Sequence, residues 1–409
     1  MKKLLSIVFA CALAFGTMMP IYAEEAAVVV SQEDLTALKN GSIASLQEST
    51  DAFYALSLLA NGADETKMKA MESSTLNVLE EAAAAPRATS QDIEKLILIA
   101  EGLGYDATKY ELNGKTVNLF DSLEGKTIAL VNDYVFALEA IHSADATIAA
   151  NSKLNKDDLI QKMLGLRNPT DHAWNWNANY TGEYGISDSD TTAMALTALA
   201  PYANNSAERM GISAETKAAV DAAVVDGFTY LSSKQGVSGA MDNGYGENAS
   251  STAVTIVALS AYGKDARSDA QFVKEGKNLV DGLMKFKNAD NLGFEVADWQ
   301  TGEMKLDLGF GTEQGLRALI ALENTTAGTP YYLYQAGAVA NQDRFKKEPV
   351  TEPEKEPVTV PEKETKPEAE KKPEKESIIK NTAKQSQEGS AIFLLIIAGA
   401  GVCVLRKYA

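Results

Sequence analysis

The chain has 409 residues, of which 45% are hydrophobic, and a formal net charge of -18. This length supplies enough apolar material for a large core, while the negative charge argues against nucleic acid or an anionic membrane as the main partner. The two cysteines, Cys11 and Cys403, lie in terminal hydrophobic segments, so the region between them can hold no disulfide, thiolate zinc site or cysteine nucleophile.

The first 23 residues have the order of a secretory signal peptide. Lys2 and Lys3 precede a long apolar run, and Ala23 ends a suitable cleavage site. We therefore expect residues 1–23 to direct the rest of the chain out of the cell.

A repeat with a spacing of sixty residues organises the predicted domain, residues 31–345, which opens with a capping box at Ser31. Thr192, Thr252 and Thr312 each stand near the start of a segment too apolar on all sides for a surface helix. More polar helices are expected between these segments, and two of them share the tripeptide Val-Asp-Gly. The repeated unit is therefore predicted to be a helical hairpin with one buried and one solvent-facing helix.

The predicted fold class is all-α, because no sustained period-two alternation is found. Helices are expected near residues 44–60, 64–83, 89–103, 115–123, 126–142, 156–165, 188–201, 214–235, 248–262, 267–287, 310–323 and 331–345. Six buried helices that alternate with six polar ones suit an α6/α6 toroid, in which inner helices surround an axis and outer helices pack around them. The loops before the inner helices would then meet at one mouth.

The C-terminal part is predicted to attach the domain to the cell surface. Residues 346–378 are rich in Pro, Glu and Lys, cannot form a core, and are expected to be a disordered stalk. Residues 379–409 begin with Ile-Lys-Asn-Thr-Ala and continue into an apolar run and a basic end. This order resembles a Gram-positive sortase sorting signal without its Pro and Gly; a plain transmembrane anchor is the alternative. Either reading places the domain on the extracellular face, held by membrane or cell wall.

The first repeat also resembles a known motif. Residues 188–193, Asp-Ser-Asp-Thr-Thr-Ala, are similar to the Asp-x-Asp-Asp-Thr-Ala motif of squalene-hopene and other class II terpene cyclases. The Gly-aromatic loops before the helices resemble those of the prenyltransferase and squalene-oxidase repeat group, which includes bacterial surface proteins. Related toroids occur in protein prenyltransferase β subunits, complement thioester domains and the cobalamin-binding domains of intrinsic factor and transcobalamin. The resemblance covers most of residues 40–340 and implies the toroid fold.

This chain lacks the catalytic and metal-binding residues that the related families use. Prenyltransferases hold zinc with Asp, Cys and His, but the domain has no Cys and only His142 and His172, and thioester domains need a cysteine that residues 311–315 do not supply. Asp190 stands at the position of the proton donor of class II cyclases, but Thr191 replaces the third Asp, and the QxxxGxW repeats are absent. We expect no catalytic residue of these enzymes, no cofactor and no metal site, with calcium binding left open.

Aromatic and acidic residues are concentrated in the loops before the expected inner helices. They would form a cleft suited to a planar ligand or a sugar face. The candidate ligand-binding residues are Trp174, Trp176, Tyr180, Tyr184, Asp188, Asp190, Tyr245, Glu247, Phe294 and Trp299. A structural role is the alternative, since the carboxylates of Asp188 and Asp190 can cap a helix and the aromatic rings can fill the end of the domain.

Two classes of function follow from the sequence, and terpene cyclase-like activity is a third, less favoured alternative. The first is a non-enzymatic, surface-displayed module that binds a glycan, a corrinoid-like small molecule or another surface protein. The second is an extracellular carbohydrate-active enzyme that would use two opposed carboxylates among Asp190, Glu247, Glu295 and Glu313. Carboxylates held in helix caps and ion pairs would favour binding, whereas two opposed carboxylates without partners would favour the enzyme.

Overall fold

The computed structural model describes residues 30–181, 185–298 and 300–328. The predicted signal peptide, stalk and anchor, and the helix expected at 331–345, lie outside these residues. The described part is mostly helical, with four two-stranded antiparallel hairpins between helices. In these residue ranges, no helix has both the length and the apolar character needed to cross a membrane.

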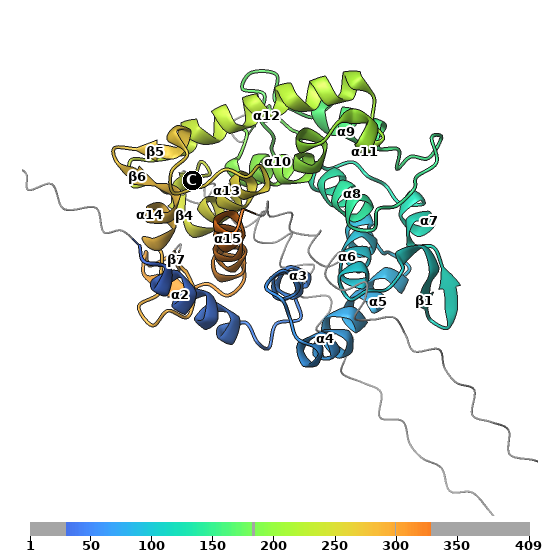
Figure 1. Cartoon of the computed structure of the whole chain (residues 1–409), viewed down its shortest axis with the longest axis horizontal. Helices are drawn as coiled ribbons and strands as arrows, with labels where there is room; N and C mark the ends of the chain where they lie inside the picture. Colours follow the sequence, from blue (N-terminus) through green and yellow to red (C-terminus); the bar gives the residue numbers. More distant parts are fainter. Residues whose placement is uncertain (1–29, 182–184, 299, 329–409) are drawn as a thin grey trace, which may run out of the picture. The chain divides into compact units, whose positions relative to one another are not determined.

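Helices alternate with connections of different length along the described chain (Figure 1). The α-helices are α2 (Gln32–Ser45), α3 (Ala52–Ala60), α4 (Glu65–Met71), α5 (Asn77–Ala84), α6 (Ser90–Gly102), α7 (Leu119–Glu124), α8 (Val131–Ser143), α9 (Lys156–Gly165), α10 (Ser189–Asn204), α11 (Ala207–Met210), α12 (Ala214–Lys234), α13 (Ala249–Ala261), α14 (Leu279–Met284) and α15 (Gly311–Thr326). The strands are β1 (Tyr110–Leu112), β2 (Lys115–Val117), β3 (Met241–Asp242), β4 (Glu247–Asn248), β5 (Val273–Lys274), β6 (Lys277–Asn278), β7 (Glu295–Ala297) and β8 (Met304–Leu306). Each odd-numbered strand pairs with the strand that follows it.

Six helices contact one another in a series that returns to its start. Helix α3 packs against α6, α6 against α8, α8 against α10, α10 against α13, α13 against α15, and α15 against α3. Other helices pack against members of this series: α12, for example, contacts α10, and α14 contacts α13. These contacts account for the uniformly apolar sequence of α13, which has neighbours on several sides and buries nearly every residue.

The threonine of the sixty-residue repeat fastens each of three helices to the connection before it. The hydroxyl oxygen of Thr192 accepts a hydrogen bond from the backbone N–H of Trp174 at 3.1 Å. Thr252 does the same for Met241 at 2.9 Å, and Thr312 for Phe294 at 3.0 Å. All three threonines are fully buried, so each bond satisfies a donor that water cannot reach. The repeated threonine therefore has a structural role, and we call its hydrogen bond the threonine clamp.

The glycine of the shared Val-Asp-Gly tripeptide marks a close approach between elements. A Cβ atom on Gly227 of α12 would lie 2.9 Å from a methyl carbon of Leu196 in α10. A Cβ atom on Gly282 of α14 would lie 2.2 Å from the backbone nitrogen of Ala240. At Gly282 the neighbouring atoms belong to the backbone and only a residue without a side chain permits this separation, whereas at Gly227 the Leu196 side chain would have to shift.

The prediction of an all-α fold misses the hairpins. The chain forms β1 and β2 around Asn113 and Gly114, where part of a helix was expected at 115–123; their φ angles of 53° and 71° are those of a tight hairpin turn. Glu275 and Gly276, with φ angles of 48° and 79°, make the same kind of turn between β5 and β6. Asn-Gly is a hairpin signal that the sequence contained and the helical interpretation passed over.

Two expected helices are also wrong in extent. The region 44–60 is divided, because α2 ends at Ser45 and the carboxylate of Asp51 caps α3 by accepting bonds from the N–H groups of Phe53 and Tyr54. The region 267–287 holds a hairpin and the six-residue α14, which Asn278 caps by accepting from the N–H groups of Val280 and Asp281. In both regions a capping side chain begins a new helix where a continuous one was expected.

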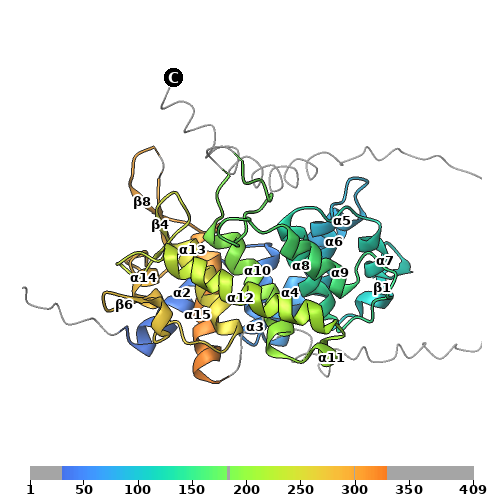
Figure 2. The same cartoon turned by 90° about the horizontal axis from the view of Figure 1, so that it is seen from above.

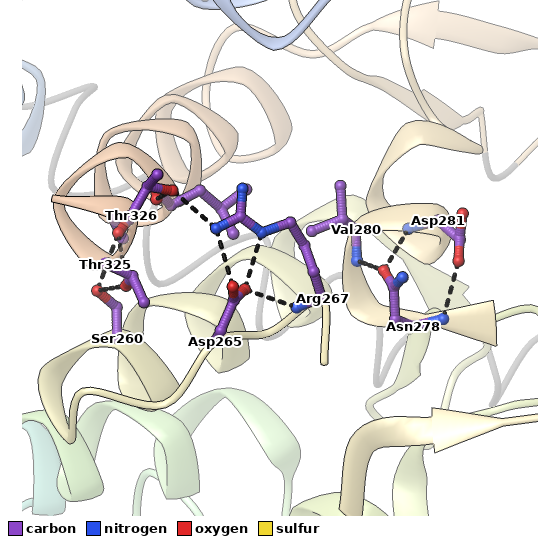
Figure 3. Close-up of polar contacts among 10 residues, drawn as sticks. Ser260, Asp265, Arg267, Asn278, Val280, Asp281, Thr325 and Thr326 are labelled. Carbon is purple, nitrogen blue, oxygen red and sulfur yellow. Dashed lines mark hydrogen bonds and ion pairs between the residues drawn. The ribbon is translucent and has the colours of Figure 1, made fainter. Parts of the chain in front are cut away.

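Polar contacts tie the C-terminal ends of α13 and α15 together (Figure 3). The hydroxyl of Ser260 donates to the carbonyl of Ala321 at 3.0 Å and lies 2.6 Å from the hydroxyl of Thr325. Arg267 pairs with Asp265 through two nitrogens and donates from one of them to Thr326. These bonds fix one end of the two helices and leave the opposite, N-terminal end to the connections that enter them.

Replacing Gly282 with Ala should lower the free energy of unfolding by about 2 kcal/mol, because the added methyl group meets backbone atoms that cannot move aside. Urea unfolding followed by circular dichroism measures the change.

Gly165, at the end of α9, is the matched control. An added Cβ there meets nothing within 4 Å, so Gly165→Ala should leave stability unchanged or raise it slightly. Equal stability of the Gly282→Ala variant and the wild type would contradict the close approach.

Candidate functional site

The candidate site lies in the three connections that enter α10, α13 and α15, which are residues 166–188, 235–248 and 285–310. Figure 2 shows the hairpins labelled β4 and β8 and the connection before α10 on the same side of the helices. The first residue of α10 touches the second connection, since the hydroxyl of Ser189 donates to the carbonyl of Asp242 at 3.4 Å. We call these three segments the entry connections.

Two of the predicted ligand-binding aromatics belong to the core. The side chains of Trp174 and Phe294 are fully buried, and the indole N–H of Trp174 donates to the carbonyl of Met163 at 2.8 Å. The backbone N–H groups of both residues are held by threonine clamps. Their position before α10 and α15 therefore reflects packing of the entry connections onto the domain.

The other described aromatics differ in exposure. Trp176 is partly buried, and its carbonyl accepts from the N–H of Val131 at 3.2 Å. Tyr180 is also partly buried and donates from its hydroxyl to the carbonyl of Leu166 at 2.7 Å. Tyr245, in the turn between β3 and β4, is 67% exposed. Tyr184 and Trp299 lie outside the described residues. Of the described aromatic residues in the predicted set, Tyr245 has the most exposed side chain.

Asp188 and Asp190 lie together at the start of α10. Asp188 caps the helix, because its carboxylate accepts from the N–H of Thr191 at 2.6 Å and from the hydroxyl of the same residue at 3.0 Å. Burial raises the pKa of Asp188 to about 7, the charge of Asp190 adds to this rise, and the bonds from Thr191 oppose it. Burial also raises the pKa of Asp190, against the effect of the polar side chains of Ser251, Ser189 and Asn243. The pair accordingly favours holding a proton in the folded protein.

Three further acidic residues of the entry connections, Glu247, Glu295 and Asp298, have partners. Glu247 accepts from Lys285 at 2.6 Å and from Ser238 at 2.7 Å. Burial opposes ionisation of Glu247, but these hydrogen bonds outweigh it and lower its pKa. Glu295 accepts from the amide of Asn288 at 2.7 Å. Lys305 donates a hydrogen bond to the carboxylate of Asp298 at 2.9 Å, and this bond lowers the pKa of Asp298. These carboxylates are used in turns and ion pairs.

Exposed apolar side chains are concentrated in the same connections. Most large hydrophobic residues with extensive exposure in the described chain lie there, and the exceptions are Val78, Val225 and Val273. The residues concerned are Ile186, Val237, Tyr245, Leu292, Val296, Met304, Leu308 and Phe310. We call this set the entry patch. The Cδ1 atom of Ile186 lies against the turn at Gly244, so the patch joins the first connection to the second.

Buried acidic residues also lie on helices of the closed series, and of these the sequence analysis named only Glu313. Glu94 of α6 is completely buried, and Asp133 and Glu139 of α8 are nearly so. On α15, Glu313 pairs with Arg317, and both are almost inaccessible. Burial raises the pKa of Glu313 to about 7, although the charge of Arg317 acts against it. The available signal was an ionisable residue inside an apolar run, such as Glu94 between Ile93 and Leu96.

A metal centre finds no support in the described ranges. Within residues 30–181, 185–298 and 300–328, no group of three or more His, Cys, Asp or Glu side chains is arranged to hold an ion. Comparison of the chain with protein families and with curated proteins finds no match. The argument for function therefore rests on the geometry of this chain.

Asp190→Asn should reduce the pH dependence of stability. A carboxyl group whose pKa is raised to about 7 in the folded state makes stability fall as pH rises from about 4 to about 7, because the folded protein holds a proton that the unfolded chain releases. Removing the charge of Asp190 lowers the pKa of Asp188, so the fall should shrink by about 1 kcal/mol. Urea unfolding at several pH values in this window measures it.

Asp221→Asn is the control, since Asp221 forms only an exposed ion pair with Lys217 on α12. It should leave the pH profile close to that of the wild type. Parallel profiles for the wild type and Asp190→Asn would show that the two carboxylates do not interact.

Proposed function

We propose that this protein is a non-enzymatic binding module displayed on the cell surface, and that a partner protein docks on its entry patch. The single observation behind the proposal is the concentration of exposed apolar side chains in the three entry connections. Large exposed apolar patches on soluble domains mark interaction sites, because water contact with them is unfavourable.

The architecture we propose is the α6/α6 toroid expected from the repeat. Its support is the closed series of contacts from α3 through α6, α8, α10, α13 and α15 back to α3, with other helices packed outside. In such an arrangement every helix of the series enters from the same side. The entry connections would then surround one mouth, which is the surface we assign to the partner.

The partners of the carboxylates favour binding over hydrolysis. A glycoside hydrolase needs two carboxyl groups that face a substrate, one of which donates a proton. Of the four candidate catalytic carboxylates, Glu247 accepts from Lys285 and Glu295 accepts from Asn288. Glu313 pairs with Arg317, and Asp190 accepts from the hydroxyl of Ser189 at 3.4 Å. Carboxylates that are engaged in this way favour a binding module over an enzyme, which would need two opposed carboxylates without partners.

The chemistry of the entry patch favours a protein over a sugar. Sugar sites rely on exposed aromatic faces together with polar groups, but Trp174 and Phe294 are buried. The exposed side chains are mainly aliphatic, as in Ile186, Val296 and Met304. Such side chains complement the apolar centre of a protein interface.

Surface display completes the proposal. It rests on the sequence of the termini, where a signal peptide at 1–23 and a stalk at 346–378 precede an anchor at 379–409. The stalk would carry the domain away from the membrane or cell wall and leave the mouth accessible.

Tyr245→Ala and Phe310→Ala should each weaken binding of the partner by about tenfold or more, because exposed aromatics at the centre of an interface contribute strongly. The measurement is a screen of purified residues 24–348 against arrays of extracellular proteins and of glycans, followed by affinity measurement of the variants on each hit.

Val225→Ala is the matched control. Val225 is 67% exposed, as Tyr245 is, but it lies on α12. It should bind with wild-type affinity. A hit among the glycans alone, or an equal loss in the Val225 control, would overturn the assignment of a protein partner to the entry patch.

A further inference from the structure

A buried carboxyl group on α6 has no hydrogen-bond partner. Glu94 is 0% exposed, and neither of its side-chain oxygens has a partner within the protein. Its sequence neighbours Ile93, Leu96 and Ile97 are buried apolar residues. An unsatisfied buried polar group costs about 1–3 kcal/mol, and a charged one costs more. Glu94 is therefore an energetic cost that nothing in the fold offsets.

Further negative charge lies beside Glu94. Asp133 and Glu139, both on α8, act on it electrostatically, as do Asp92 and Lys95 of its own helix. The amide of Gln91 donates to Asp133 at 2.8 Å, which joins α6 to α8 next to Glu94. Carboxylates thus outnumber cations around Glu94, and the imbalance favours a positively charged ligand.

One side of α8 adds acceptors and aromatic surface. Asn132, Phe136 and Glu139 are spaced four and three residues apart and share a helix face. The side-chain oxygen of Asn132 is buried without a hydrogen-bond partner. The ring of Phe136 lies 5.5 Å from the ring of Phe53 on α3. Aromatic faces attract cations, and this region already uses that attraction.

Two cationic side chains of the protein already lie near the Phe53 ring. The ammonium of Lys95 lies 5.5 Å from the centroid of the Phe53 ring, and the guanidinium of Arg317 lies 4.9 Å from it. Neither cation reaches the oxygens of Glu94, since these have no partner. The fold therefore gathers positive groups around Phe53 while the nearby carboxyl group stays unsatisfied.

We propose that Glu94, with Asp133 and Glu139, forms a site for a small primary ammonium ion between α6 and α8. An ammonium group carries three N–H donors, which would satisfy the oxygens of Glu94 and the side-chain oxygen of Asn132. Asp133 and Glu139 supply the negative field, and the rings of Phe53 and Phe136 suit the positive charge. A metal ion fits less well, because no three acidic side chains in the described ranges converge as metal ligands do.

Binding should release a proton. Burial, followed by repulsion from Asp133, raises the pKa of Glu94 well above its usual range, so the free protein holds the carboxyl group neutral. An ammonium ion that binds the ionised carboxylate displaces that proton to solvent and leaves the net charge of the site unchanged. Affinity should therefore rise with pH until Glu94 is ionised in the free protein.

The test is titration calorimetry of the full chain in detergent with methylammonium chloride, at about pH 6 and about pH 8, in buffers of different ionisation enthalpy. We expect affinity several-fold higher at the higher pH, with a proton released on binding. Tetramethylammonium chloride serves as the ligand control, because it has the same charge and no N–H donor. It should not bind.

Glu94→Gln should abolish binding, since it removes the charge while keeping the shape of the side chain. The matched variant is Glu101→Gln, on the same helix: burial raises the pKa of Glu101 to about 7, but that residue accepts a hydrogen bond from the N–H of Ala107 at 2.9 Å. It should bind methylammonium as the wild type does.

Circular dichroism and thermal unfolding establish that Glu94→Gln folds, and its melting temperature without ligand should equal or exceed that of the wild type because the replacement cannot be ionised. Three results would overturn the proposal: no methylammonium binding to the wild type, unchanged binding in Glu94→Gln, or equal binding of tetramethylammonium. None of them bears on the entry patch, so this site and the docking surface are tested separately.

Discussion

The described fold depends on a hydrogen bond between a buried threonine hydroxyl and the backbone of the connection that precedes its helix. Thr192 forms this bond with the N–H of Trp174, Thr252 with that of Met241, and Thr312 with that of Phe294. Loss of any one hydroxyl would leave a buried N–H without a partner, which costs more than the bond itself contributes. The clamp thus couples the positions of α10, α13 and α15 to the paths of the connections before them.

This coupling separates the two roles of the connections. The clamped residue and its side chain complete the core, so the aromatic ring of Trp174 is an internal packing element. The segment beyond the clamp is free to face solvent, where Ile186 and Tyr245 are exposed. Our proposal places a partner on these exposed segments and a small cation among the buried acids of α6 and α8. The first site requires access from outside, and the second requires enclosure.

The sequence predicts the helical parts well where one physical rule decides the outcome. The apolar repeat around Thr192 locates α10. The capping box at Ser31 coincides with the start of α2, although the first helix was expected only at 44–60. It predicts less where rules compete: the turn at Asn113 and Gly114 overrides weak helical propensity. The sequence could not predict which aromatic side chains of the candidate site are buried. An aromatic residue before a helix can fill the core, as Phe294 does, or face solvent, as Tyr245 does. Only the tertiary path of the connection distinguishes these outcomes.

The threonine clamp also closes connections of unequal length. The clamped pairs are separated by 18 residues for Thr192, 11 for Thr252 and 18 for Thr312. The entropy of closing a flexible loop changes by only about 0.4 kcal/mol between these lengths. Insertions and replacements between the clamped residue and its threonine would therefore change the stability of the core little. A lineage of such proteins could diversify its outer surface by exchanging these segments while the helices beneath them stay constant.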